Sequence, residues 1–200
     1  AETINYVSCH DDLSLVDKLR ASAPEGMTEE ELVRFDKLAQ TVVLTAQGIP
    51  SLFAGEEMLR TKGGVSNSHD SPDRVNRIDW SFKADHKDVF DYYRGLIALR
   101  RTHPAFRLAT AAEIERHLRF LDTGDTHVVA YRLVDHAGGD PWREILVVYN
   151  GARAEKRVRI PPGDWHAVCL DGRIASEALA VFSGDSVPVP ASSALIAYLP

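Results

Sequence analysis

The amino-acid sequence predicts a chain in two parts, an α/β region followed by an all-β region. In residues 1–105, short apolar segments alternate with segments whose apolar residues recur at helical spacing. From residue 106 onward, short β-rich segments are separated by turn residues. We therefore place a domain boundary near residue 105. A length of 200 residues with 44% hydrophobic residues suffices for one or two domains with buried cores.

The α/β region begins with an apolar segment that ends in acidic residues. Ile4–Cys9 contains Ile, Tyr and Val, which is typical of a buried strand, and His10-Asp11-Asp12 follows it directly. We expect these three residues to start a polar loop. A short helical turn is predicted over residues 13–21, ended by Pro24-Glu25-Gly26.

A helix and a second strand follow. Thr28 and Glu31 form a capping-box signature, apolar residues recur at helical spacing between residues 32 and 46, and Gly48 ends the pattern. The segment 49–54 is predicted to be a second strand, closed by Gly55-Glu56-Glu57. Both predicted strands thus end in carboxylates.

A long polar loop and a third helix complete the α/β region. Residues 60–80 are rich in Gly, Ser, Asn, Asp and Pro, and a loop of that length is usually functional or disordered. Asp85 is the expected N-cap of the third helix, whose apolar face continues until Pro104.

The all-β region is predicted to be an antiparallel β-sandwich over residues 106–200. Turn signals separate its short segments, at 138–140, 150–151, 161–164 and 171–172. The expected strands are residues 128–133, 145–149, 157–160, 165–170, 187–189 and 195–199.

The charge pattern excludes some classes of partner. The formal net charge is -6, with acidic and basic residues interspersed, so we expect neither nucleic acid nor membrane as a partner. No apolar run reaches the roughly 18 residues of a membrane span, and the first residues lack the layout of a signal peptide. The compartment stays open. Cys9 and Cys169 lie far apart and are expected to be free thiols.

Three motifs resemble one enzyme family. The segment from Asn5 to Asp12 resembles the α-amylase superfamily region in which His-Asp ends the seventh barrel strand, and residues 47–57 resemble the eighth strand of that superfamily. Residues 67–80 are similar to a loop of type I pullulanases with Asn-Ser, Ser-Pro-Asp, Val-Asn and Ile-Asp-Trp. The departures are Asp12, His69 and Asp70, where that pattern has Asn, Tyr and Asn.

The resemblance implies a specific architecture. Residues 1–105 would be the last two βα units of a TIM-type (β/α)8 barrel, and residues 106–200 a C-terminal antiparallel β-sandwich. A complete barrel has eight strands and about 250 residues. In this family the nucleophile and the acid/base follow earlier strands, so the resemblance implies that the isolated chain is inactive. The parent enzyme would cleave α-1,6-glucosidic links of pullulan, starch or glycogen with retention.

The resemblance also implies roles for the acidic strand ends. Asp11 corresponds to the carboxylate that stabilises the transition state by binding the distorted sugar, and His10 would donate a hydrogen bond to the same sugar. Polar side chains of the 60–80 loop can form hydrogen bonds with sugar hydroxyls. A solvated loop stabilised by its own Asx turns would have the same composition, so this alternative stays open. The candidate substrate-binding residues of this loop are Asn67, Asp73, Arg74 and Asn76.

The residues alone permit other interpretations. Retaining glycosidases place two carboxyl groups about 5–5.5 Å apart, and paired strands lie about 4.8 Å apart, so Asp11 and Glu56 qualify as a catalytic pair. The resemblance argues against this pair and favours structural roles for Glu56 and Glu57. Alternatively, Asp11 and Asp12 merely cap the next helix.

Metal and aromatic sites are weaker candidates. His10, Asp11, His69 and Asp70 include no histidine spacing that specifies a metal, so no metal and no cofactor are expected, and calcium in the parent enzyme is left open. Aromatic residues stack on sugars in some sites, but packing is the favoured role for Trp80, Trp142 and Trp165.

Two rival functions remain at this point. One is another enzyme of the same superfamily, such as an isoamylase, a neopullulanase or a trehalose-processing enzyme. The other is a non-catalytic carbohydrate-binding or scaffold protein.

Overall fold

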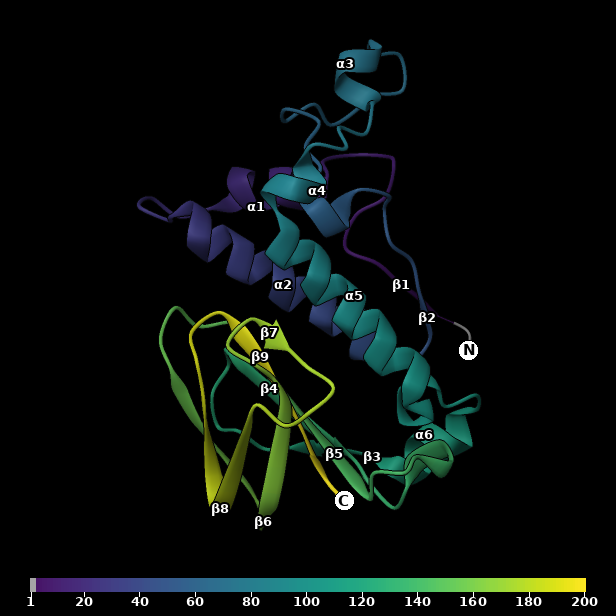
Figure 1. Cartoon of the computed structure of the whole chain (residues 1–200), viewed down its shortest axis with the longest axis vertical. Helices are drawn as coiled ribbons and strands as arrows, with labels where there is room; N and C mark the ends of the chain where they lie inside the picture. Colours follow the sequence, from purple (N-terminus) through teal and green to yellow (C-terminus); the bar gives the residue numbers. More distant parts are fainter. Residues whose placement is uncertain (1–2) are drawn as a thin grey trace.

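The computed structural model describes residues 3–200. A helical part packs on one face of an antiparallel sheet, and a loop bearing a short helix projects from the helical part (Figure 1). The elements of the first part are β1 (Ile4–Asn5), α1 (Leu15–Ser22), α2 (Glu29–Thr45), β2 (Ile49–Pro50), the 3-10 helix η1 (Glu56–Met58), α3 (Asp73–Asn76), α4 (Phe82–Asp85), α5 (Lys87–Thr102) and the 3-10 helix η2 (Pro104–Arg107).

The two predicted strands of the α/β region pair in parallel, but they are shorter than the sequence pattern indicated. Ile4 lies opposite Ile49, and Asn5 lies opposite Pro50. Parallel strands that pair with only one neighbour receive few ladder hydrogen bonds, and Pro50 has no N–H to donate. The apolar residues Ile4, Tyr6 and Ile49 are 64%, 56% and 50% exposed, so this edge presents apolar surface to solvent.

The predicted capping box of the long helix is confirmed. The Glu31 amide donates to Thr28 Oγ1 at 3.2 Å, and the Thr28 amide donates to the Glu31 carboxylate at 2.9 Å. The prediction that Asp85 caps the next helix is wrong, because Asp85 ends the separate short helix α4 and His86 is the N-cap of α5. The Asp79 carboxylate accepts from the Ser81 amide at 3.1 Å, which starts the extra turn.

Residues 111–200 form one further helix and a seven-stranded sheet. The strand order is β3-β4-β5-β9-β6-β7, with β8 paired to β6, and the pairs are antiparallel. The sequence prediction missed α6, β3, β7 and the first part of β8. The elements are α6 (Ala111–His117), β3 (Leu118–Leu121), β4 (Val128–Leu133), the 3-10 helix η3 (Ala137–Gly139), β5 (Glu144–Asn150), β6 (Lys156–Leu170), β7 (Arg173–Ile174), β8 (Ala180–Val189) and β9 (Ser193–Leu199).

Strand β6 runs through the segment 161–164, where the sequence predicted a turn, so that prediction is wrong. The pairing register with β8 shifts between Arg159 and Gly163, which marks a bulge. Pro161 and Pro162 have no backbone N–H to donate to a neighbouring strand, and a bulge tolerates the missing ladder hydrogen bonds. The part of the β6–β8 ladder that precedes the bulge covers the sheet face that points away from the helices, where Val158 and Val187 pack in one cluster with Leu146.

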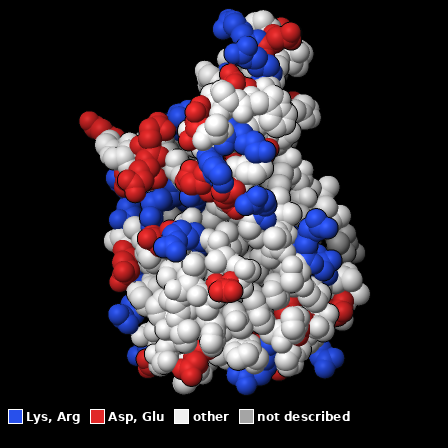
Figure 2. Space-filling view, in the orientation of Figure 1, with Lys and Arg blue, Asp and Glu red and all other residues white. Residues whose placement is uncertain are grey.

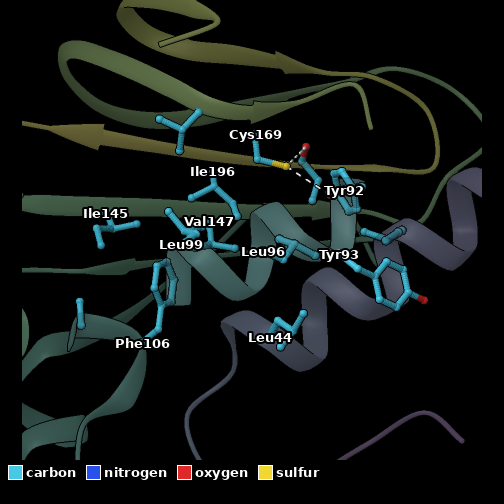
Figure 3. Close-up of a cluster of buried hydrophobic side chains, with 14 of the residues drawn as sticks. Leu44, Tyr92, Tyr93, Leu96, Leu99, Phe106, Ile145, Val147, Cys169 and Ile196 are labelled. Carbon is cyan, nitrogen blue, oxygen red and sulfur yellow. Dashed lines mark hydrogen bonds between the residues drawn. The ribbon is translucent and has the colours of Figure 1, made fainter. Parts of the chain in front are cut away.

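Both faces of the sheet are buried. Along β5, Ile145 and Val147 belong to the cluster that faces the helices, whereas Leu146 and Val148 belong to the cluster on the opposite face. In Figure 3, residues of α2 and α5 interdigitate with those of the sheet, and the Tyr92 hydroxyl meets the Cys169 sulfur at 3.3 Å. The cluster that faces the helices therefore joins the helical part of the chain to the sheet. Among residues 3–200, no helix combines the length and apolar character needed to cross a membrane.

Candidate functional site

His10 and Asp11 occupy an exposed turn that follows β1. Their side chains are 83% and 69% exposed, and His10 Nε2 lies 3.5 Å from Asp11 Oδ1. Asp12 adopts a φ of 56°, a left-handed conformation that Asp tolerates better than most residues and that turns the chain toward α1. The N-cap position of α1 belongs to Ser14. The capping alternative for Asp11 and Asp12 is therefore not supported, and the Asp11 carboxylate is open to a ligand.

A buried lysine fixes this turn to the start of the 60–80 loop. Lys62 is 2% exposed, and its Nζ atom donates to the His10 carbonyl at 3.1 Å and to the Ser66 carbonyl at 3.2 Å. A buried ammonium that donates to both segments holds them in one arrangement. No local sequence signal marks this role, since nothing in the motif singles out Lys62.

A second anchor lies beside the first. The Asp17 carboxylate accepts from Ser14 Oγ at 2.8 Å, from Thr61 Oγ1 at 2.5 Å and from the Lys62 amide at 2.7 Å. Burial raises the pKa of Asp17, but these hydrogen bonds outweigh it and leave the pKa below its ordinary value. An ionised Asp17 thus ties α1 to the base of the loop.

The four candidate residues of the loop fall into two groups. Asn67, Asp73 and Arg74 are exposed on the projecting part that carries α3, where basic and acidic side chains gather at the top of Figure 2. Asn67 Oδ1 lies 3.0 Å from His69 Nδ1. Asn76 differs from these three, because its amide nitrogen donates to the carbonyls of Ser68 at 2.6 Å and Ser71 at 3.1 Å.

Arg60 secures the same loop from below. Its guanidinium donates to the carbonyl oxygens of Ala54, at 2.9 Å, and Asn76. The structure thus brings His10 and Asp11 together and connects them to the base of the loop through Lys62. Asp73 and Arg74 lie farther out, at the projecting end (Figure 1).

Glu56 is buried and cannot form an exposed catalytic pair with Asp11. It is 2% exposed, and its carboxylate accepts from Ser8 Oγ, from Gln40 Nε2 at 2.8 Å and from the Phe53 amide at 3.3 Å. Burial raises its pKa to about 7. Glu57 accepts from the Gly55 amide at 2.9 Å. These contacts support structural roles for both glutamates.

The metal candidates of the sequence are only partly brought together. Among residues 3–200, Cys9, His10 and Asp11 have one ligand atom each within 4.8 Å of one another, and neither His69 nor Asp70 belongs to this group. The cationic amine of Lys62 is bonded to the His10 backbone, which disfavours a second cation nearby.

The tryptophans have different surroundings. The Trp142 ring stacks on His103 at 3.5 Å and on Tyr198 at 4.0 Å between ring centroids, and Trp165 is fully buried. Packing is thus the role that the structure gives to both. Trp80, in contrast, is 67% exposed at the end of the 60–80 loop.

Comparisons with known proteins agree with the motifs. Residues 114–173 match the family model described as the all-beta domain of pullulanase. The pullulanase of Bacillus subtilis is 40% identical over 80% of this chain and 22% of its own length. The solved pullulanase of Bacillus acidopullulyticus superposes with a TM-score of 0.94 at 46% identity, over 98% of this chain and 24% of that one. The Bacillus subtilis type I pullulanase complexed with maltose gives a TM-score of 0.91 at 34% identity, over 98% of this chain and 27% of that one.

The fold and these matches make the chain similar to part of a glycoside hydrolase. Within that class it is pullulanase-like, as the three motifs predicted, and it corresponds to a C-terminal portion of such an enzyme. It spans about a quarter of the length of these relatives.

Proposed function

We propose that the chain supplies part of the active site of a retaining glycoside hydrolase that cleaves α-1,6-glucosidic branch links in pullulan, starch or glycogen. The observation that carries this proposal is the exposed His10–Asp11 turn, fixed by Lys62 to the base of a pullulanase-type loop. The similarity to a pullulanase solved with maltose supports an α-glucan as the ligand.

Asp11 is proposed to stabilise the transition state. Its carboxylate would accept hydrogen bonds from hydroxyls of the distorted sugar and strengthen them as positive charge develops on the ring. His10 would donate to the same sugar from its exposed ring. Because neither residue forms or breaks a bond, both act by binding the transition state more tightly than the substrate.

The 60–80 loop is proposed to line the substrate-binding cleft. The exposed Asn67, Asp73 and Arg74 side chains offer amide, carboxylate and guanidinium groups to sugar hydroxyls. The Asn76 amide nitrogen is already engaged with two loop carbonyls, so its contribution would be to hold the shape of the loop.

We further propose the finer architecture that the resemblance implies. The parallel pair β1–β2 with its helices would be the last two βα units of a (β/α)8 barrel over residues 1–105, and residues 106–200 would be the C-terminal β-sandwich. The exposed apolar edge of β1 and β2 supports this proposal, because strands of a closed barrel have neighbours on both sides. The nucleophile and the acid/base would come from outside residues 1–200.

Reducing-sugar release from pullulan tests the proposal. The 200-residue chain should release none, whereas a chain extended upstream to a complete barrel should release maltotriose. Hydrolysis by the short chain would mean that the catalytic pair lies within these 200 residues and would overturn the assignment.

A non-catalytic carbohydrate-binding role is the second candidate. The exposed polar loop and Trp80 favour it, because both can contact sugars without chemistry. Tight binding of maltotriose by the short chain, with no hydrolysis by the extended one, would support binding alone.

A further inference from the structure

A buried polar cluster contacts the segment that leads into the His10–Asp11 turn. It joins Asp36 and Gln40 of α2, Glu56 of η1 and Tyr93 of α5 to Ser8, which precedes His10 by two residues. Asp36, Gln40 and Glu56 are 1%, 0% and 2% exposed. None of the proposed sugar contacts uses these groups.

The hydrogen bonds divide unevenly between the two carboxyl groups. Glu56 accepts three, from Ser8, Gln40 and the Phe53 amide. Asp36 accepts one, from the Tyr93 hydroxyl at 2.7 Å to Oδ1. Three donors stabilise an ionised carboxylate, so the negative charge of the cluster belongs on Glu56.

Within residues 3–200, two buried side-chain oxygen atoms are left without a hydrogen-bond partner. They are Asp36 Oδ2 and Gln40 Oε1, which belong to residues one helical turn apart on the same face of α2. An ionised Asp36 would leave both as acceptors, and two acceptors cannot bond to each other. A protonated Asp36 carries an O–H donor, which satisfies both atoms with a single hydrogen bond.

We propose that Asp36 is protonated in the folded protein and donates from Oδ2 to Gln40 Oε1, which makes Asp36 and Gln40 positioning residues for the His10–Asp11 turn. The hydrogen bonds then run without a break from Tyr93 through Asp36 and Gln40 to Glu56, and Ser8 bonds Glu56 from the other side. The positioning role rests on the function proposed above, whereas the protonation of Asp36 does not.

The charged groups around Asp36 agree with this arrangement. Its pKa is raised to about 8, chiefly by burial and also by the nearby charge of Glu56, although the Tyr93 hydrogen bond and the charge of Lys37 act in the opposite direction. Glu57 of the same 3-10 helix raises the pKa of Glu56. Because Asp36 accepts one hydrogen bond and Glu56 accepts three, Asp36 is the carboxyl group that holds a proton at neutral pH.

Asp36→Asn tests the protonation because an amide reproduces the neutral acid. Its nitrogen donates toward Gln40 Oε1, and its oxygen accepts from Tyr93. At pH values above the ordinary pKa of aspartate, the wild type must take up a proton at Asp36 when it folds, whereas Asp36→Asn need not. We expect equal urea midpoints at pH 4, and at pH 7 a higher midpoint for Asp36→Asn than for the wild type.

Two further variants keep the test decisive. Asp36→Ala removes the side chain and should lower the midpoint at both pH values. Glu56→Gln replaces a carboxylate that accepts three hydrogen bonds with an amide whose nitrogen can only donate. This variant should also lower the urea midpoint. A midpoint of Asp36→Asn below the wild type at both pH values would overturn the proposal. A midpoint raised by Glu56→Gln would overturn it too, because the proton would then belong to Glu56.

Spectroscopy on the folded chain gives a readout that does not depend on activity. At pH 7.5, a protonated-carboxyl infrared band should be present in the wild type and in Glu56→Gln and absent in Asp36→Asn, and its persistence in Asp36→Asn would contradict the proposal. In the extended enzyme, Gln40→Ala should lower kcat on pullulan at nearly constant KM, while Asp36→Asn keeps the wild-type kcat. Loss of kcat in both variants would contradict the positioning role.

Discussion

The buried amine of Lys62 donates a 3.1 Å hydrogen bond to the carbonyl of His10. This bond joins the turn that carries Asp11 to the loop that carries the other candidate sugar contacts. It follows that the shape of the candidate site depends on a residue that need not touch the ligand.

Lys62→Met should therefore loosen both segments. The substitution keeps the apolar stem but removes two hydrogen bonds from a charged donor, each of which is worth about 1.5–3 kcal/mol. We expect a loss of about 2–4 kcal/mol in the free energy of unfolding, measured by urea denaturation. Lys87→Met is the matched control, because Lys87 is exposed and pairs with Asp91 one helical turn away. It should change stability by less than about 0.5 kcal/mol. Equal effects of the two substitutions would contradict the anchoring role.

Asp17→Asn should lower stability in a pH-dependent way. The folded pKa of Asp17 lies below its unfolded value of about 3.9, so its contribution is present above the unfolded pKa and is lost as the pH falls through the folded pKa. Urea midpoints of wild type and variant should differ at pH 7 and converge near pH 2–3. A difference that stays constant over this range would point to packing rather than to ionisation.

The two cysteines should differ in reactivity. Burial raises the pKa of Cys169 to about 12, and its sulfur lies against Tyr92, whereas Cys9 is only half-buried. Because the thiolate is the reactive form, a thiol reagent at pH 8 should label one cysteine in the folded chain and two in urea. Cys9→Ser should abolish the labelling of the folded chain, and rapid labelling in that variant would contradict the burial of Cys169.

The sequence predicted the features that depend on local pattern. The capping box at Thr28 involves residues three apart, and the parallel neighbours at Ile4 and Ile49 follow from two apolar runs that end in carboxylates. The prolines before Gly163 looked like a turn because a bulge and a turn use the same residue types, and only pairing with β8 decides between them.

The candidate site was predictable where a motif covers it. His10 and Asp11 lie at the exposed end of the segment that follows β1, as the pattern required. The roles of Lys62, Asp36 and Gln40 depend on contacts between distant segments and carry no local signal. Asn76 resembled its neighbours Asn67 and Asp73 in sequence, but its surroundings direct its amide into the loop.

Hydrolysis of pullulan by the upstream-extended enzyme carrying Asp11→Asn tests the central claim most directly. If Asp11 stabilises the transition state, kcat should fall by about 10²–10³, the range found when one preorganised stabilising group is removed from an active site. The matched control Asp12→Asn changes the next residue of the same exposed turn and should keep kcat within a few-fold. Wild-type kcat in Asp11→Asn, or equal losses in both variants, would contradict the role proposed for Asp11.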